Sequence, residues 1–291
     1  MKQIAFLTLD KRGDFVIDDE LAVKPMADLG WQVSIVSWRQ TRVPWRQYDA
    51  VIIRSTWDYW NDVEGFLEVL KVIDNETRLA NSLPLVYWNL AKTYLREMEQ
   101  KGVMIVPTLW PQVLDAPFME ASFDRLECDE IVVKPVVGAN GEDTFRLERG
   151  SDGENVMAIT RLFNQRSSMV QRFMPAILSE GEYSLFFFNG AFSHAILKVP
   201  ARGEFRSQEE RGAEIKPIRP EKKLLQCGLR ALATINPAPL YARIDLVRNG
   251  ETDFVVMELE LIEPSLYLRT DAGAPARFAQ AVDQWFSMAS R

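Results

Sequence analysis

The chain has 291 residues, of which 47% are hydrophobic and 26% charged, as is typical of a globular protein and not of a disordered one. Its formal net charge of −7 argues against nucleic acid or an anionic membrane as a partner, because both require a basic surface. Two isolated cysteines, no signal-peptide pattern and no apolar stretch of about 20 residues favour a cytoplasmic protein without a disulfide framework.

The N-terminal part alternates strand and helix patterns. Period-two and continuous apolar runs predict strands, and apolar residues at helical spacing predict helices between them. This alternation predicts an α/β unit with a parallel sheet covered on both faces. The expected strands are 3–9, 31–38, 48–55 and 83–88, and the expected helices are 18–30 and 62–73.

From residue 89 the pattern changes to consecutive short strands. A helix is expected at 89–102, with Asn89 as its N-cap and Gly102 as its end. Strands joined by short connections predict an antiparallel sheet. The expected strands are 130–135, 143–148, 168–173, 183–188, 191–199, 240–247 and 254–261, with further helices at 220–235 and 276–288.

The third expected strand runs into the sequence "RSTWDYW". Ligands of open α/β sheets bind beyond the carboxyl ends of the strands, so Arg54, Ser55, Thr56 and Asp58 are candidates for binding a small polar substrate. An ordinary loop with an aromatic side chain packed beneath it is the alternative. No G-x-G-x-x-G follows the first strand, which argues against a dinucleotide site there.

A lysine and a glycine-containing loop follow the strand at 130–135. Lys134 supplies a point charge for phosphate, and the glycines of "VGANG" allow backbone N–H groups to approach an anion closely. The alternative is a lysine that protects an edge strand, followed by an ordinary turn.

The next polar stretch, "ARGEFRSQEERGAE", is too long for a simple turn. Its arginines Arg206 and Arg211 are either solvated loop charges or a clamp for phosphate or carboxylate. His194, the one histidine in the chain, lies in a strand-like alternation, and we expect a sheet residue with a satisfied ring. This count excludes zinc sites built on several histidines.

Four charged residues lie within apolar, strand-forming sequence near the C-terminus. Strand alternation places Arg243 and Asp245 on one face, and Glu258 and Glu260 on one face. A hairpin with the loop "GETD" pairs Asp245 with Glu258, whereas an "NG" turn gives another register. Converging carboxylates suit Mg²⁺, and a salt-bridge cluster around Arg243 is the alternative.

Together these features resemble the ATP-grasp carboxylate–amine ligases. The order is an α/β domain, a helix lysine (Lys92), a strand lysine with a glycine loop, R-x-D, and E-x-E before a proline. The chain is similar to the branch that holds glutathione synthetases, ribosomal-protein glutamate ligases and the D-cycloserine-forming ligase. The resemblance implies a substrate domain at 1–88, a small lid subdomain at 89–170 and a C-terminal catalytic subdomain at 171–291.

The resemblance also implies roles for individual residues. ATP and Mg²⁺ are the implied cofactors, with Mn²⁺ as the alternative ion, and the implied partners are a small carboxylate and a small amine, with a homodimer also considered. By resemblance, the phosphates contact Lys92, Lys134, Lys198 and the loop residues Gly138, Asn140 and Gly141; the nucleoside contacts Gln171, Arg172, Phe173 and Glu182; the reacting groups contact Arg206, Arg211 and Arg243; and Asp245, Glu258 and Glu260 bind the metal.

Two departures from the family pattern affect these roles. Glu260 stands where relatives usually carry an asparagine, and one extra residue precedes Pro264. Glu142 and Asp143 lie in the glycine loop, where their charges would repel phosphate unless they point away or bind metal.

The reaction implied by the resemblance is ATP-dependent ligation through an acyl phosphate, with release of ADP and phosphate. An ATP-binding module without ligase activity is the alternative function. A metal-free glycosidase with two carboxylates fits poorly, because nothing else in the chain indicates a sugar cleft.

Overall fold

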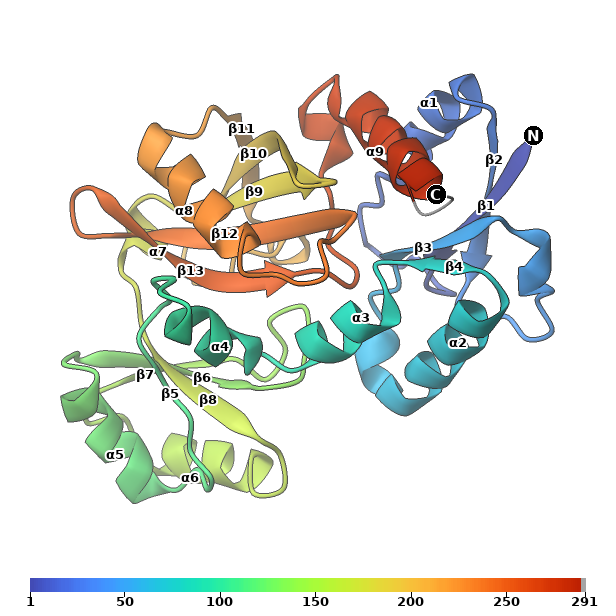
Figure 1. Ribbon diagram of the computed structural model, residues 1–291. Coiled ribbons are helices and arrows are strands. Elements are labelled where there is room, and N and C mark those ends of the chain that lie inside the picture. Colours follow the sequence, from blue (N-terminus) through green and yellow to red (C-terminus); the bar gives the residue numbers. More distant parts are fainter. Residues whose placement is uncertain (289–291) are drawn as a thin grey trace.

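Three sheets form the framework of the protein, and the computed structural model describes residues 1–288 (Figure 1). A parallel sheet built from the N-terminal residues is followed by two antiparallel sheets. This arrangement confirms the predicted mixed α/β class. Residues 289–291, at the end of the predicted subdomain 171–291, lie outside the described part.

The N-terminal sheet is built around strand β1, with strand order β2-β1-β3-β4. Its apolar strands are covered on both faces, and every residue of β3 is buried, as expected for a parallel sheet. Helix α2 presents Phe66, Leu70 and Ile73 to this core. The elements are β1 (Lys2–Thr8), α1 (Val23–Asp28), β2 (Trp31–Ser37), β3 (Ala50–Ser55), α2 (Val63–Glu76) and β4 (Arg78–Ala80).

Two predictions at the end of this region are wrong. The expected strand at 83–88 is helix α3 (Leu83–Leu90), with Pro84 in its first turn, where a proline is tolerated, and the fourth strand is the shorter β4. A helix is present within the expected range 89–102, but it is the shorter α4 (Tyr94–Gln100), and the predicted Asn89 N-cap is the second error. Asn89 caps nothing, because its buried carboxamide bonds the backbone of Leu259 and Leu261 instead.

The smaller antiparallel sheet has the strand order β5-β8-β6-β7 and packs against two helices, α5 and α6 (Figure 1). Neither helix was predicted from the sequence. They begin at Asp115 and Asp152, whose side chains accept hydrogen bonds from backbone N–H groups of the first turn. The elements are β5 (Thr108–Leu109), α5 (Ala116–Arg125), β6 (Glu130–Pro135), β7 (Phe145–Glu148), α6 (Gly153–Leu162) and β8 (Ser168–Arg172).

The larger antiparallel sheet has the strand order β11-β10-β9-β12-β13. Helix α8 lies close against it at Gly228, where a Cβ atom would stand 2.4 Å from Leu185 Cδ1. The elements are α7 (Ala176–Ser179), β9 (Glu182–Phe188), β10 (Ala191–Val199), β11 (Glu214–Ile218), α8 (Lys222–Leu232), β12 (Tyr241–Asn249) and β13 (Asp253–Glu260). Short 3₁₀ helices lie at Asp19–Ala22, Trp45–Gln47, Tyr59–Asn61, Glu209–Arg211 and Leu268–Thr270.

Helix α9 (Ala274–Met288) returns to the N-terminal sheet (Figure 1). Phe278 and Val282 of this helix share one core with Ile4 and Phe6 of β1. The Trp31 indole donates a hydrogen bond of 2.9 Å to Asp283. The two ends of the described chain are therefore packed into one hydrophobic core.

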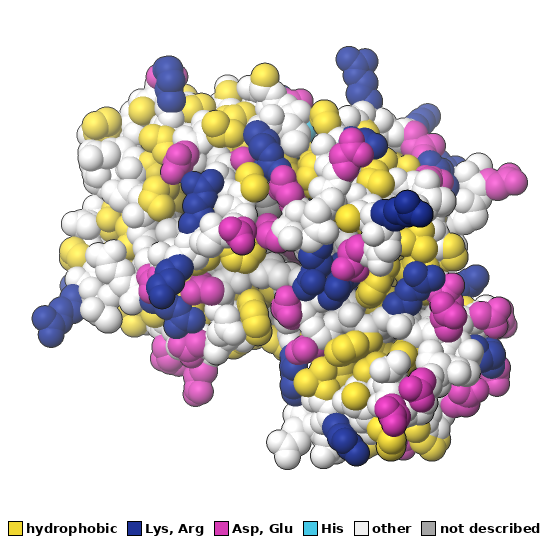
Figure 2. Space-filling view, turned by 180° about the vertical axis from the view of Figure 1, so that it is seen from behind, with side chains coloured by type: hydrophobic (Ala, Val, Ile, Leu, Met, Phe, Trp, Pro, Cys, Tyr) yellow, Lys and Arg dark blue, Asp and Glu magenta, His cyan; other side chains and the backbone are white. Residues whose placement is uncertain are grey.

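The surface is mixed in charge on the face shown in Figure 2, where basic and acidic side chains are interspersed. Among the described helices, none is long and apolar enough to cross a bilayer.

His194 is buried, its ring stacks on Phe186 with centroids 4.3 Å apart, and its Nε2 lies 2.9 Å from the carbonyl oxygen of Leu266. The prediction of a satisfied sheet histidine is confirmed.

Candidate active site

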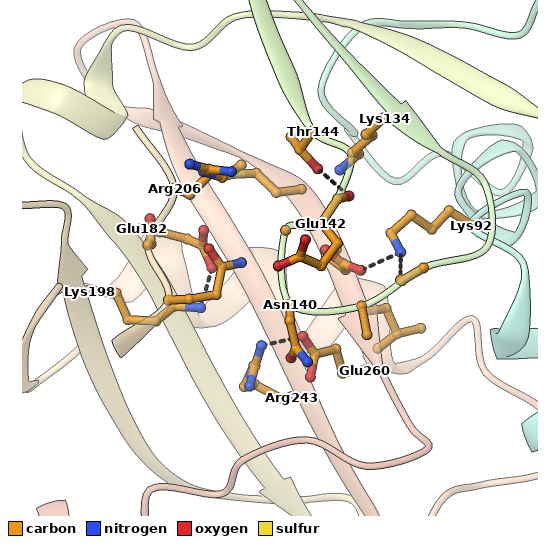
Figure 3. A pocket seen from close by; sticks show the side chains of 18 of the residues that line it. Lys92, Lys134, Asn140, Glu142, Thr144, Glu182, Lys198, Arg206, Arg243 and Glu260 are labelled. Atoms are coloured by element: carbon orange, nitrogen blue, oxygen red, sulfur yellow. Dashed lines mark hydrogen bonds and ion pairs between the residues drawn. The ribbon is translucent and has the colours of Figure 1, made fainter. Parts of the chain in front are cut away.

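A cavity opens where the three sheets approach one another, and residues from all three predicted segments line it. Figure 3 shows its charged side chains, with Lys92 and Lys134 on one side and Arg243 and Glu260 on the strands opposite. Cations and carboxylates thus alternate around a single space.

Lys92 lies in the break between α3 and α4, where Ala91 has an extended backbone. Its ammonium donates a 2.6 Å hydrogen bond to the Gly138 carbonyl and lies 3.1 Å from Glu258 Oε1. Although burial opposes the charge of Glu258, Lys92 and Lys134 lower the pKa of this carboxyl. The break in the helix therefore brings one lysine to both the glycine loop and the carboxylate strand.

Lys134 is the cation with no such pairing. The described residues offer its ammonium no hydrogen bond or ion pair, although the side chain lines the cavity at the end of β6. Burial, reinforced by the charge of Lys92, lowers the pKa of Lys134. A half-buried cation without a partner costs free energy that an anionic ligand would offset.

The glycine loop between β6 and β7 is held over the cavity. Asn140 has a φ of 56° and donates through Nδ2 to the Trp57 carbonyl at 3.3 Å. Gly141 has a φ of 63°, and a Cβ atom there would stand 3.0 Å from Gln208 Oε1. Only glycine combines this backbone conformation with so close a neighbour.

The two acids of this loop are both paired. Glu142 accepts a 2.8 Å hydrogen bond from Arg211, and Asp143 accepts a 2.5 Å hydrogen bond from Arg166. Arg211 does not line the cavity but ties the segment after β10 to the loop. Arg211 therefore neutralises Glu142 and thereby lessens the repulsion that Glu142 would exert on phosphate.

The β12–β13 hairpin has the predicted pairing, with Arg243 opposite Glu260 and Asp245 opposite Glu258. The turn differs from the expected "GETD" loop, because residues 250–252 form it and Leu246 pairs with Val256. Met257 is the extra residue of a β-bulge, and it restores the predicted register toward the cavity. Without the bulge, Asp245 would oppose Met257.

The carboxylates of this hairpin do not form a three-carboxylate metal group. Asp245 is 2% exposed and is held by Arg243, Lys198 and the Ser184 hydroxyl. Although burial disfavours its charge, Arg243 and Lys198 lower the pKa of Asp245 to about 2. Within residues 1–288, no cluster of three or more His, Cys, Asp and Glu side chains could hold a metal ion. The expected convergence is thus replaced by ion pairs, and metal binding stays a prediction.

Glu260 faces the cavity and forms an ion pair with Arg243. Burial raises its pKa, and despite Arg243 the neighbouring carboxylates Asp245 and Glu258 help to bring it to about 7. In this structure the Glu260 carboxylate thus orients an arginine, which the neutral amide usual in relatives could not do by ion pairing.

Lys198 and Glu182 form a second pair across β9 and β10. Burial works against the charge of Lys198, but Asp245 and Glu182 outweigh it and raise its pKa above the ordinary lysine value. Both side chains line the cavity. Lys198 also lies 3.5 Å from Asp245, so the pair joins Asp245 of β12 to the end of β10.

The predicted nucleoside residues lie along one wall. Gln171, Arg172 and Phe173 follow one another at the end of β8 and line the cavity. The Gln171 carboxamide donates to Thr108 at 3.0 Å, and the Arg146 guanidinium lies 4.0 Å from the centre of the Phe173 ring.

Phe205, Ser207 and Gln208 line the cavity beside this wall and had no predicted role, whereas Arg206 among them was predicted. Phe205 meets Phe173 edge to face, with ring centres 6.2 Å apart. Arg206 lines the cavity and is oriented by Glu204. The Ser207 hydroxyl and the Gln208 carboxamide oxygen are buried with no hydrogen-bond partner among the described residues. The signal was the run "EFRSQ", of which only the arginine was used.

The four predicted substrate residues do not line the cavity. Arg54 is 2% exposed, pairs with Asp19 at 3.0 Å and donates to the Pro264 carbonyl at 3.1 Å. Ser55 bonds Thr8, Thr56 is fully buried, and Asp58 accepts from Trp38 and Arg39. The reason is that this strand end is covered by the 3₁₀ helix at Asp19–Ala22 and by residues 263–264. The intervening aromatics Trp57 and Tyr59 line the cavity instead.

Comparison with known proteins identifies the family. Residues 4–81 match the model of the D-cycloserine synthetase DcsG N-terminal domain, and residues 119–231 match that of the prokaryotic glutathione synthetase ATP-grasp domain. The cycloserine biosynthesis protein DcsG of Streptomyces lavendulae is 30% identical over 273 residues, covering 87% of this chain and 89% of that protein. The chain belongs to the ATP-grasp ligases.

Solved structures agree with this ATP-grasp assignment. The crystal structure of D-cycloserine synthetase DcsG matches with a TM-score of 0.86 and 28% identity over 98% of this chain and 99% of that one. The ATP-grasp ligase PsnB, in complex with a minimal precursor, Mg and ADP, shares the fold at a TM-score of 0.66 and 14% identity, with 98% of both chains covered. The suspected family is confirmed.

The family fixes the class of reaction. This ATP-grasp ligase is an enzyme that uses ATP to join a carboxylate to an amine in small substrates. An ATP-binding module without ligase activity, the alternative left open by the sequence, is set aside by this membership.

Proposed function

We propose that the protein activates the carboxylate of a small amino-acid or peptide-like substrate as an acyl phosphate and then joins it to an amine. In the first step the bond between the γ-phosphorus of ATP and ADP breaks, and a bond from that phosphorus to a carboxylate oxygen forms. In the second step the amine nitrogen attacks the carbonyl carbon, phosphate leaves, and the nitrogen loses a proton. Similarity to a cycloserine biosynthesis protein supports a substrate derived from an amino acid.

The observation that carries this proposal is the set of lysines and arginines that gathers around one cavity. Lys134 has no hydrogen bond or ion pair with the described residues, and Lys92 lies between the glycine loop and Glu258. We assign Lys92, Lys134, Lys198 and the loop to the phosphates, and Arg243 and Arg206 to the charge that develops during transfer. Gln171, Arg172 and Phe173 would contact the adenine, and Glu182 the ribose.

Hard oxygen ligands for Mg²⁺ are available on the β13 strand. Glu258 and Glu260 both line the cavity, whereas Asp245 lies behind Arg243 and Lys198, so the donor set fits an ion held by one or two carboxylates and by phosphate oxygens. Bound there, Mg²⁺ would neutralise phosphate charge, and Mn²⁺ has the same ligand preference. The chain's own part is to hold the reacting groups in place.

Release of ADP tests the proposal. With Mg-ATP present, ADP should appear only when a pool of amino acids and small peptides is added, and the product should gain an amide bond by mass spectrometry. Hydrolysis at an unchanged rate with and without the pool would contradict the proposal.

A further inference from the structure

Glu263 differs from the other acids on the cavity wall. It is half-buried and lines the cavity, yet its carboxylate has no hydrogen bond or ion pair with any residue that the structure describes. The other acids of the wall that are shielded from bulk solvent each have a cation: Glu182 pairs with Lys198, Glu258 with Lys92, and Glu260 with Arg243.

The position of Glu263 is fixed by the N-terminal domain. Its backbone carbonyl accepts a 2.7 Å hydrogen bond from the Trp57 indole. The carbonyl of the next residue, Pro264, accepts from Arg54 at 3.1 Å. The carboxylate is therefore held on a braced segment, and it is not the end of a mobile loop.

Three aromatic side chains, Phe15, Trp57 and Tyr59, line the same cavity as Glu263. Trp57 lines the cavity beside it, and Phe15 packs against Trp57 with ring centres 5.1 Å apart. Tyr59 also lines the cavity, and burial raises its pKa, to which the charge of Glu263 adds. A carboxylate with aromatic walls is the arrangement that recognises an organic cation.

We propose that Glu263 binds the ammonium group of the substrate. This inference rests on the proposed ligase function with an amino-acid substrate and adds the residue that recognises the amino group. Glu263 is assigned as a specificity-determining residue at the end of the cavity bounded by the N-terminal domain.

The electrostatics agree with that geometry. Burial raises the pKa of Glu263 to about 8, the charge of Glu260 adds to this effect, and Lys92 and Arg243 only partly offset it. An acid in this state gains most from a ligand that brings its own positive charge, because that charge replaces the missing partner.

Binding can be measured without turnover by following the thermal midpoint of the protein with Mg-ADP. One probe is a mixture of free amino acids of both enantiomeric series, and the matched probe is the same mixture N-acetylated, which lacks the ammonium group. We expect the free mixture alone to raise the midpoint. Glu263→Gln should need about 10- to 100-fold more of it for the same shift, the loss expected for a charge-assisted hydrogen bond.

Two variants serve as controls. Glu251→Gln removes an acidic charge at the exposed turn of the β12–β13 hairpin and should respond as the wild type does. Glu263→Asp keeps the charge on a shorter side chain and should recover part of the response. Titration with Mg-ADP alone should be within twofold in all variants.

The outcomes separate this inference from the proposed function. Equal shifts with free and N-acetylated mixtures, no shift with either, or an unaltered response of Glu263→Gln would each overturn the inference. A shift lost in Glu263→Gln without any ADP release by the wild type would support the ammonium site and contradict the proposed ligation of these substrates.

Discussion

The two ends of the cavity differ in how their charges are balanced. Beside the glycine loop, Lys92 is shared between Glu258 and a backbone carbonyl, and Lys134 has no ion pair with any described residue. Beside the N-terminal domain, the Glu263 carboxyl has no partner among residues 1–288, and Trp57 and Tyr59 line the same cavity. Among the described residues, one end thus lacks an anion and the other lacks a cation.

This difference assigns the ends to different ligands. On the proposals above, a nucleotide would bring negative charge to the first end, and an amino-bearing substrate would bring positive charge to the second. Each ligand would bring the opposite charge to a group that has no partner among the described residues, and such a group costs free energy when it is left alone. Selectivity would therefore come from these unpaired groups.

The largest effect is expected from breaking the support of the Glu263 end. Arg54→Met leaves Asp19 buried without its cation and removes the bond to Pro264, so we expect the free energy of unfolding to fall by about 3–5 kcal/mol. Urea denaturation followed by circular dichroism measures this. A stable variant with reduced substrate binding would instead restore the original prediction that Arg54 contacts substrate.

Removing the Glu258 carboxylate from the cavity wall should affect turnover and not folding. Glu258→Gln keeps the shape of the side chain but loses the charge that faces the lysines, so kcat should fall by about 100-fold or more. Steady-state ADP release measures the loss, and the thermal midpoint of the variant should stay near that of the wild type. Retention of activity would rule out a role for this carboxylate in metal binding.

Lys134→Met tests the unpaired cation at the glycine-loop end. The KM for ATP should rise by about 10- to 100-fold, because a charge-assisted contact is lost. The ligand-free protein should become no less stable, since a half-buried cation without a partner is removed. The control is Lys11→Met, on the exposed surface, which should change neither quantity.

A pH series of thermal midpoints tests the Glu263 carboxyl at the other end of the cavity. The carboxyl of Glu263 has an ordinary pKa of 4.5 when unfolded and about 8 when folded, so the folded state binds the extra proton between these values. Stability contributed by this group is therefore present at low pH and is lost as pH rises through about 8. Glu263→Gln should melt above the wild type at pH 9 and at the same temperature at pH 4, because glutamine carries no charge at either pH. A constant difference across the series would contradict this assignment.

The smallest effect is expected from Asp143→Asn in the glycine loop. Asp143 pairs with Arg166, and both side chains are partly exposed, so the variant should lose less than about 0.5 kcal/mol of stability and keep kcat/KM within about twofold. Chemical denaturation and ADP release measure the two quantities. A loss of magnesium dependence would show instead that the aspartate binds metal.

Much of the fold was predictable because its strands carry clear alternation or long β-branched runs. The hairpin pairing of Asp245 with Glu258 was predicted correctly, although the turn length assumed for it was wrong. A bulge at Met257 compensated for the shorter turn. A bulge that contains no glycine has no local sequence signal that would predict it. The apolar run at 83–88 was taken for a strand because short apolar runs do not separate strand from helix by periodicity.

The substrate loop shows why the rest could not be predicted. Arg54 and Asp58 have the residue types of a binding site, but segments distant in sequence, including Asp19 and Pro264, cover or neutralise them. Glu263 escaped notice because sequence patterns showed an acid before a proline and gave no hint that it lacks a partner. Which polar residue is satisfied is a property of tertiary packing.

The return of helix α9 to the first sheet has a consequence for synthesis on the ribosome. Strand β1 leaves the ribosome long before α9, but its core is completed only by Phe278 and Val282 of that helix. The Trp31 indole finds its acceptor only after Asp283 has been translated. The N-terminal sheet must therefore remain incompletely buried while nearly all of the chain is translated. We expect ribosome-bound chains that stop before α9 to bind chaperones through this open face, and chains that include α9 to be released from them.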